Sequence, residues 1–317
     1  MADNAELSDS NNRLKVSFME QTTVNTRSPQ WLQTGAKERY LDGICYPLDA
    51  HMWQRPRPQG LPRERTPMSV STLDASDCPA LCLDRSVEWW DPDTECTLVA
   101  AEPTTEPQLW AEYVRGAQDS YSRHGVERAL DLGSLRNPGD TSLFLAAMDQ
   151  NGHMVAGVRA KGPYGAADES HAVVEWAGRP GLDTVRKLIA DRIPFGVVEV
   201  KTAWVTDDPT RNRSLTNALA RFPLHSALLL DAKFALATSG AHVLARWRTT
   251  GGLVATQVPP TPYPDERYQT TMMWWDRGTF AKHAEVRQAS RIATEFRLLA
   301  RHLDGAGETR MLAGSQQ

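Results

Sequence analysis

The chain lacks any long apolar run: none of its stretches approaches the roughly 18 consecutive apolar residues that a membrane-spanning helix needs. It also lacks a strong charge of either sign, because 35 basic and 39 acidic side chains give a formal net charge of -4. This balance gives no reason to expect nucleic-acid binding. The first residues, M-A-D-N-A-E-L, are polar and acidic, unlike a secretory signal. Together these absences predict a cytoplasmic globular protein.

Cysteine is scarce and confined to the first third of the chain, at Cys45, Cys78, Cys82 and Cys96. Four thiolates could bind zinc, but the C-x3-C spacing of Cys78 and Cys82 differs from the C-x2-C pairs of zinc knuckles. Reduced thiols are the interpretation that the sequence favours. No metal is therefore expected.

The sequence divides into four segments. Residues 1–27 are polar and are expected to be disordered. Residues 28–105 are rich in proline, arginine and tryptophan, which predicts an irregular extension wrapping the core. Regular structure is expected over 106–281, and 282–317 should form a C-terminal helix and tail.

Within 106–281 the patterns of helices and strands alternate. T-S-L-F-L-A-A-M and H-M-V-A-G-V-R-A-K predict a hairpin around D-Q-N-G, and the segment 166–178 fits either a strand or a helix. Ser239 is a candidate cap for a helix that starts at residue 240. Further helices are predicted at about 107–124, 183–192 and 279–303, and one from about 209 that Pro223 should end or kink, followed by a second helical stretch to about 230. Further strands are predicted at about 195–205, 233–238, 253–258 and 268–275. This order predicts an α/β fold with a mixed central sheet.

Three motifs carry a family resemblance: G-V-R-A-K-G-P-Y-G at 157–165, V-V-E-V-K-T-A-W-V at 197–205, and S-G-A-H-V-L-A-R-W-R-T-T-G-G at 239–252. Their order and spacing resemble the GNAT acyltransferases, and most closely the acyl-homoserine-lactone synthases and N-acyl amino acid synthases. The resemblance covers residues 106–277. It implies a GNAT-like fold and transfer of an acyl group from a thioester on phosphopantetheine, carried by coenzyme A or by an acyl carrier protein.

The chain departs from the family pattern at two places. Thr202 stands where the resembled synthases have an arginine three positions after the strand glutamate. The loop 206–213 contains no glycine, whereas GNAT enzymes have a glycine-rich pyrophosphate loop there. The second departure favours a carrier-bound phosphopantetheine arm over tightly bound coenzyme A.

Glu199 and Lys201 interrupt the apolar strand F-G-V-V-E-V-K-T-A-W-V. Burying an unpaired charge costs several kcal/mol, so both need a structural or catalytic reason. Strand alternation is expected to place them on one face with Val197, Ala203 and Val205. Glu199 is the candidate base for the amine, because desolvation raises a carboxyl pKa toward that task. The alternative is a structural ion pair.

Other polar side chains complete the candidate catalytic and acceptor sites. Glu175 beside Trp176 is a second candidate base. Arg159 could bind a carboxylate of the acceptor or orient Glu199, or it could be a surface residue. Tyr164 could line the acceptor pocket or pack on the sheet, and His242 could assist proton transfer or be structural.

The donor is expected at the end of the same strand. Arg211, Arg213 and Ser214 lie where a helix begins, a position that suits an anion, although a solvated basic loop is the alternative. The resemblance implies that main-chain N–H groups near Trp204 and Val205 stabilise the oxyanion. It also implies a thiol-protonating tyrosine; because the helix from 240 to 250 has none, either Tyr263 or Tyr268 serves, or the chain has no such acid.

The sequence thus predicts an N-acyltransferase that acylates a small amine, such as an amino acid. One alternative is an acetyl-CoA-dependent enzyme acting on a small amine or a protein. The other is a GNAT-like binding module without catalysis.

Overall fold

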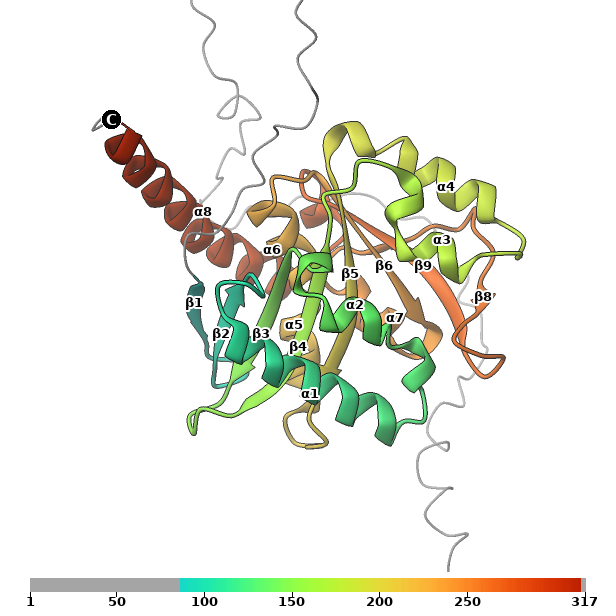
Figure 1. The fold of residues 1–317 in the computed structure, drawn as a ribbon, viewed down its shortest axis with the longest axis horizontal. Coiled ribbons are helices and arrows are strands. Elements are labelled where there is room, and N and C mark those ends of the chain that lie inside the picture. The colour runs from blue at the N-terminus through green and yellow to red at the C-terminus, as the bar shows by residue number, and fades with distance from the viewer. Residues whose placement is uncertain (1–85, 315–317) are drawn as a thin grey trace, which may run out of the picture. The chain divides into compact units, whose positions relative to one another are not determined.

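The computed structural model describes residues 86–314, with side chains through residue 303. A mixed sheet of nine strands forms its centre in the order β1-β2-β3-β4-β5-β6-β9-β7, with β8 paired to β9 (Figure 1). Strands β5 and β6 run parallel, and the other described pairs are antiparallel. The strands are β1 (Val87–Asp91), β2 (Cys96–Ala101), β3 (Leu143–Met148), β4 (Met154–Lys161), β5 (Val197–Val205), β6 (Phe234–Gly240), β7 (Leu253–Val254), β8 (Thr261–Pro262) and β9 (Gln269–Asp276).

Helices cover both faces of the sheet, and each face has its own apolar core. One face, in front in Figure 1, carries α1 (Pro107–Arg123), α2 (Leu132–Arg136), α3 (His171–Glu175) and α4 (Leu182–Ala190). The other carries α5 (Asn212–Leu219), α6 (Phe222–Leu229), α7 (Leu244–Arg248) and α8 (Val286–Gly314). The α/β fold class expected from the sequence, with a mixed central sheet flanked by helices, is confirmed.

Regular structure begins earlier than expected. Strands β1 and β2 fall inside the segment 28–105, and β2 pairs with β3 along its whole length. The expectation of an irregular extension up to residue 105 is therefore wrong for residues 87–101. In β1 the side chains alternate between buried and exposed, as half-buried strands require. The expectations for residues 1–85, including three of the four cysteines, lie outside the described residues.

Three element boundaries differ from those expected from the sequence or were left open by it. Ser239 lies inside β6, and the next helix starts with a 3-10 turn at Ala241–Val243, so the expected cap is wrong. The strand expected at 253–258 is reduced to Leu253–Val254. The ambiguous segment 166–178 contains a 3-10 turn followed by α3.

A bulge in β5 changes which side chains share a face. Lys201 pairs with Arg159 and Trp204 with Gly157, so β5 has one residue more than β4 between these pairs, and Thr202 has φ 53°. A β-bulge of this kind shifts the alternation by one residue. Before the bulge, Glu199 and Lys201 face α3; after it, Ala203 and Val205 pack into the core beneath α5 and α6. The expectation that 197, 199, 201, 203 and 205 share one face is wrong beyond residue 201.

Beyond the middle of the sheet, β5 and β6 diverge. Their parallel ladder runs from Val197↔Phe234 to Val200↔Ala237. Strand β5 then continues to Val205 and β6 to Gly240, and the ladder does not continue between them. We call this divergence, between 201–205 and 238–240, the fork. Beyond Val200, β5 therefore has no β6 partner, and Thr202 O in this part accepts from Tyr113 Oη at 2.7 Å.

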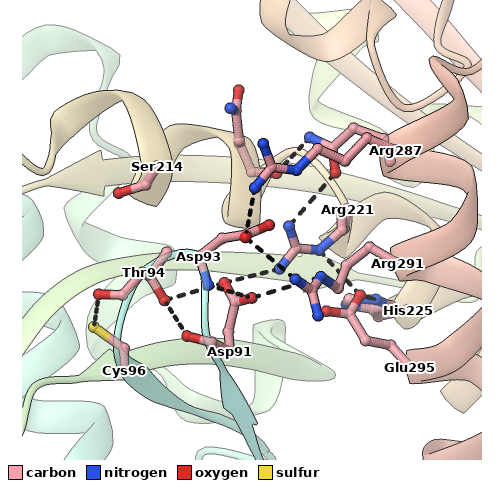
Figure 2. A network of polar contacts seen from close by, with 12 residues as sticks. Asp91, Asp93, Thr94, Cys96, Ser214, Arg221, His225, Arg287, Arg291 and Glu295 are labelled. Carbon is pink, nitrogen blue, oxygen red and sulfur yellow. Dashed lines mark hydrogen bonds and ion pairs between the residues drawn. The ribbon is translucent and has the colours of Figure 1, made fainter.

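A buried ion network fastens α6 and α8 to the β1–β2 hairpin (Figure 2). Arg221 Nη2 lies 3.0 Å from Asp91 Oδ2, and Arg221 Nε lies 3.0 Å from Glu295 Oε2. His225 Nε2 lies 2.9 Å from the same Glu295 oxygen. At the edge of the network, Arg287 pairs with Asp93 of the hairpin. These contacts attach the hairpin to α6 and α8, the helices that cover the face of the sheet opposite α3.

Candidate active site

A buried ion pair lies where the fork opens. Lys201 Nζ donates to Glu175 Oε1 in a short contact and to Thr238 Oγ1 at 3.1 Å. Thr238 Oγ1 in turn donates to Glu175 Oε1 at 3.0 Å. The side chains of Glu175 and Lys201 are 1% and 13% exposed. The pair therefore joins α3 and β5 to β6 at the first unpaired position of the fork.

Only one of the two Glu175 carboxylate oxygens is satisfied. Oε1 accepts from Lys201 and Thr238, whereas Oε2 is buried and has no hydrogen-bond partner among the described residues. Burial raises the pKa of Glu175, and Lys201 opposes that rise only in part. For Lys201, burial lowers the pKa, but Glu175 and Glu199 outweigh it and hold it above the ordinary value. The ammonium is thus retained, while the carboxylate is poised to gain a proton.

Glu199 is fully buried and occupies a different environment. Its Oε2 accepts from Tyr164 Oη at 2.7 Å, Ser170 Oγ at 3.0 Å and the His171 N–H at 2.8 Å. Its Oε1 accepts from the Ala172 N–H at 3.2 Å. Oε2 thus accepts three hydrogen bonds and Oε1 one, so neither oxygen is without a partner. Glu199 therefore binds the first turn of α3, next to the Ser170 cap.

Tyr164 is buried, and its hydroxyl donates to Glu199. Burial, reinforced by the Glu199 charge, raises its pKa well above the ordinary value. The hydroxyl therefore remains protonated as a donor to Glu199. This geometry favours a packing and positioning role over a free place in an acceptor pocket.

Two aromatic hydroxyls and a histidine approach the Glu175–Lys201 pair, and neither His171 nor Tyr121 was singled out from the sequence. His171 Nε2 lies 3.0 Å from Tyr263 Oη and 3.8 Å from Glu175 Oε1. Burial, with Lys201 nearby, lowers the pKa of His171 to about 4, so the ring is neutral at pH 7. Tyr121 of α1 interacts electrostatically with Lys201 and Glu175. His171 lies in the segment of ambiguous pattern, so no sequence signal identified it.

Arg159 is buried and has only hydroxyl partners. Nη1 donates to Ser134 Oγ at 3.0 Å and to Thr141 Oγ1 at 2.9 Å, and Nε donates to Thr202 Oγ1 at 3.4 Å. Among the described side chains no carboxylate lies within ion-pair distance of Arg159, whereas its neighbour Lys161 pairs with Asp140 at 2.9 Å. Arg159 is not a surface arginine, because the residue is only 2% exposed. Asp140 is its indirect counter-ion, because Ser134 Oγ donates to Asp140 and the Arg159 charge helps to lower the pKa of Asp140. A buried guanidinium without a direct carboxylate partner can bind an anionic ligand.

The expected donor site is only partly free. Arg211 Nη2 donates to Thr94 O at 3.2 Å and to Cys96 Sγ at 3.0 Å, so this guanidinium braces the β1–β2 hairpin. Asp208 accepts from the Thr210 N–H with its side chain and from the Arg211 and Asn212 N–H groups with its carbonyl. Arg213 is exposed, and Ser214 Oγ donates to Arg211 O. Of the three expected residues, Arg213 is the cation left for a phosphate.

Trp204 and Val205 lie in the second half of β5, beside the fork. Trp204 is buried beneath α1, and its Nε1 has no hydrogen-bond partner in the described region. Val205 is half-buried on the opposite face. Successive N–H groups of a strand point to opposite edges. Since the Thr206 N–H donates to Val155 of β4, the Trp204 N–H also faces β4, and of the two implied oxyanion groups the Val205 N–H faces the fork.

His242 is exposed, and its ring centroid lies 6.3 Å from that of Tyr268. The structure does not bring it to the Glu175–Lys201 pair by any contact. Of the two tyrosines considered for protonating a thiolate, Tyr263 reaches this pair through His171, whereas Tyr268 stacks against Arg267.

The described residues contain neither a metal-binding cluster nor a membrane-spanning helix. Between residues 86 and 314 no group of three or more His, Cys, Asp or Glu side chains could hold a metal ion. Cys96 is buried, and burial raises the pKa of its thiol. No helix in the same range is long and apolar enough to cross a membrane. The cytoplasmic location stays a prediction.

The arrangement combines two carboxylates, one ammonium and one guanidinium without a direct carboxylate partner, beside the part of β5 that has no β6 partner. Such a site can take a proton from an amine, hold a carboxylate, and pair its main chain with an extended ligand. Proton transfer and amide chemistry are therefore within its capacity.

Solved structures with a similar fold include acyl-transferring enzymes. FeeM, an N-acyl amino acid synthase from uncultured soil microbes, has 12% sequence identity and a TM-score of 0.43, covering 61% of this chain and 97% of that chain. The CoA-dependent acyl-homoserine lactone synthase BjaI has 15% identity and a TM-score of 0.38, covering 64% and 96%. One is an N-acyl amino acid synthase and the other an acyl-homoserine lactone synthase, the two groups of enzymes that the sequence resembles.

No family model matches the chain. The uncharacterized protein Rv1356c of Mycobacterium tuberculosis is 49% identical over 229 residues, which cover 72% of this chain and 87% of the relative. The uncharacterized protein Mb1391c of Mycobacterium bovis gives the same values. This chain therefore belongs to the protein family of the mycobacterial protein Rv1356c.

Proposed function

We propose that this protein is an N-acyltransferase that moves an acyl group from a phosphopantetheine thioester to the amine of a small molecule. The observation that carries the proposal is the Glu175–Lys201 pair at the opening of the β5–β6 fork. A buried carboxyl with a raised pKa, placed beside an unpaired strand edge, suits removal of a proton from an amine. Glu199 and Glu175 are the two candidate bases.

The thioester arm would lie along the part of β5 that has no β6 partner, since pantetheine carries amide groups that can pair with a strand as a peptide does. In that position its carbonyl would approach the main chain of Trp204 and Val205, where the Val205 N–H could stabilise the oxyanion. Arg213 and Ser214 would meet a phosphate at the start of α5. The resident partners of Arg211 and of the Asp208 turn limit what a coenzyme A pyrophosphate could gain there.

Arg159 supports an acceptor that bears a carboxylate, such as an amino acid. Its guanidinium is buried, hydrogen-bonded to hydroxyls only, and lies on the strand next to Glu199 and Lys201. A carboxylate would supply a direct ion pair, which Asp140 gives only through Ser134. The amine of an α-amino acid held there would point to the pair of carboxylates on α3 and β5.

The test is a product assay with defined donors. Octanoyl-CoA and octanoyl acyl carrier protein are each incubated with the protein and a mixture of the common amino acids. Thiol release and N-octanoyl amide are measured by absorbance and mass spectrometry. Acylation by either donor supports the proposal and identifies the carrier. Acetyl-CoA is included, because turnover with it alone would favour the acetyltransferase alternative. Absence of amide with all donors would overturn the proposal in favour of a binding module.

A variant tests the acceptor. Arg159→Met should raise KM for an amino acid at least tenfold, because a charge-assisted pair contributes about 1.5–3 kcal/mol. It should leave KM for a matched amine without a carboxylate, such as ethylamine beside alanine, within threefold. An equal effect on both acceptors would remove Arg159 from carboxylate recognition.

A further inference from the structure

We propose that Glu175 is the residue that accepts the amine proton, and that Glu199 is a positioning residue that holds α3, and through it Glu175, at the fork. This inference rests on the proposed acyl transfer. It separates two carboxylates that lie close together but have different environments.

Glu199 is engaged by the protein at both oxygens: Oε2 accepts three hydrogen bonds and Oε1 accepts one. Two of these hydrogen bonds come from main-chain N–H groups of α3. Without this carboxylate the N–H groups of α3 would lack an acceptor in the interior, which would cost free energy. The protein itself therefore engages both oxygens of Glu199.

Glu175 has a free acceptor site. Oε2 is buried and unpartnered in the described structure, while the side chain is 1% exposed. A buried carboxylate oxygen without a hydrogen bond is unfavourable, unless a ligand group or a water molecule donates one to it. An acceptor amine has N–H groups that would do so, directly or through one water. The direction of the Glu175 pKa, which burial raises, agrees with this role.

Helix α3 connects the two carboxylates, because Glu199 binds its first turn and Glu175 is its last residue. It has five residues, His171–Glu175, and a helix this short does not form without outside contacts. Glu199 and the Ser170 cap bind its first residues. Glu175 is its last residue, and Lys201 binds the carboxylate from β5. Loss of the Glu199 contacts would therefore loosen α3 and displace Glu175.

Glu175 alone can carry the proton from the amine to the leaving sulfur. The lone pair of a neutral amine forms the C–N bond to the thioester carbonyl carbon, and one N–H proton passes to Glu175 Oε2. As the C–S bond breaks, the sulfur keeps the bonding electrons and receives that proton as a thiol. Glu175 returns to its ionised form, with Lys201 as its counter-ion. The sum is thioester plus amine giving amide plus thiol.

Several groups set the proton affinity of Glu175. From β5 it meets Lys201 and Glu199; from α3, His171; from the chain before β9, Tyr263; and from α1, Tyr121. His171 is neutral above its pKa of about 4, and burial holds the pKa of both tyrosines above the usual range. Lys201 and Glu199 are therefore the charges that matter near neutral pH.

The experiment compares Glu175→Gln and Glu199→Gln in kcat/KM, in its pH dependence, and in amide hydrogen exchange of α3. Glu175→Gln should lower kcat/KM by about 10²–10⁴-fold and abolish the fall in rate toward low pH. Glu199→Gln should lower the rate less and leave that fall in rate at the wild-type pH. It should speed exchange at the His171 and Ala172 amides at least tenfold, since an amide offers fewer acceptor sites than a carboxylate.

Controls keep the outcome interpretable. Glu169→Gln changes an exposed carboxylate that accepts only the Gly165 N–H, and it should stay within twofold of wild type. Glu175→Gln leaves Lys201 without its partner, so the double variant Glu175→Gln/Lys201→Met tests activity with a neutral pair if the single variant does not fold.

Each result decides one claim. A Glu175→Gln protein within threefold of wild type, or a low-pH fall in rate that disappears only in Glu199→Gln, overturns this inference while the acyl transfer stands. A wild-type protein that forms no amide overturns the proposed function and the base role with it. Unchanged exchange at α3 in folded Glu199→Gln overturns the positioning role in either case.

Discussion

The indole ring of Trp204 lies against the backbone of Gly116, so closely that a Cβ built on the glycine would overlap ring carbons. On the other side of the ring, a Cβ on Gly157 would lie 3.1 Å from Trp204 Nε1 and 2.6 Å from Tyr113 Cδ2. Two glycines, on α1 and β4, thus make the space that holds the second half of β5. The position of the fork depends on this packing.

Gly116→Ala should destabilise the protein by about 1–2 kcal/mol. Alanine gains up to about 1 kcal/mol over glycine in a helix interior, but overpacking against Trp204 costs about 1–3 kcal/mol. Chemical denaturation measures the difference. Ala111→Gly on the exposed side of α1 is the control, and it should cost about 1 kcal/mol. A stabilised Gly116→Ala protein would contradict the packing argument.

Arg221→Met should cost about 3–5 kcal/mol, because it removes the buried cation that Asp91 and Glu295 share and leaves only Arg291, at 4.0 Å, for Asp91 and His225 for Glu295. The matched control is Lys187→Met, which removes an exposed pair with Asp191 whose side chains are 73% and 52% exposed. That control should cost less than about 1 kcal/mol. Similar losses of unfolding free energy in both variants would show that the buried network does not hold α6 to the hairpin.

His171 should make stability depend on pH in a mildly acidic window. Burial, then Lys201, lowers its pKa from 6.5 to about 4 in the folded protein. Between these values the unfolded chain binds the proton and the folded chain does not, so this stability is present above 6.5 and is lost as the pH falls toward 4. The slope from one group is at most about 1.4 kcal/mol per pH unit.

His171→Gln should remove that contribution, as measured by denaturation at several pH values. The control is His153→Gln, whose imidazole side chain is 78% exposed. If the pH slope between 4 and 6.5 is the same in wild type and His171→Gln, the assignment to His171 fails.

Thr202 tests the bulge. A β-branched residue at φ 53° is strained, at a cost of about 1–2 kcal/mol. Thr202→Gly should relieve this strain, whereas Thr202→Val keeps it and removes the hydroxyl that Arg159 contacts. We expect the glycine variant to be more stable than the valine variant by about 1 kcal/mol. The reverse order in thermal unfolding would show that the backbone at Thr202 is not strained.

Much of the fold was predictable because local patterns are strong there. The helix Pro107–Arg123 and the hairpin of Leu143–Met148 with Met154–Lys161 follow from apolar spacing and an Asn-Gly turn. Strand β1 was missed because it lies next to a segment rich in proline and arginine. The candidate base at 175 and the pair 199/201 were also visible as charges beside apolar residues.

By itself the sequence determined the elements, their order and the presence of charges in a buried strand, since these depend on neighbours along the chain. Only the tertiary structure decided what each charge does. The bulge at Thr202 reverses the faces of β5, and long-range contacts give Glu199 to α3, Lys201 to Glu175 and Arg211 to the hairpin. Partners distant in sequence fix which carboxylate is satisfied and which keeps a free oxygen, and no local pattern records that choice.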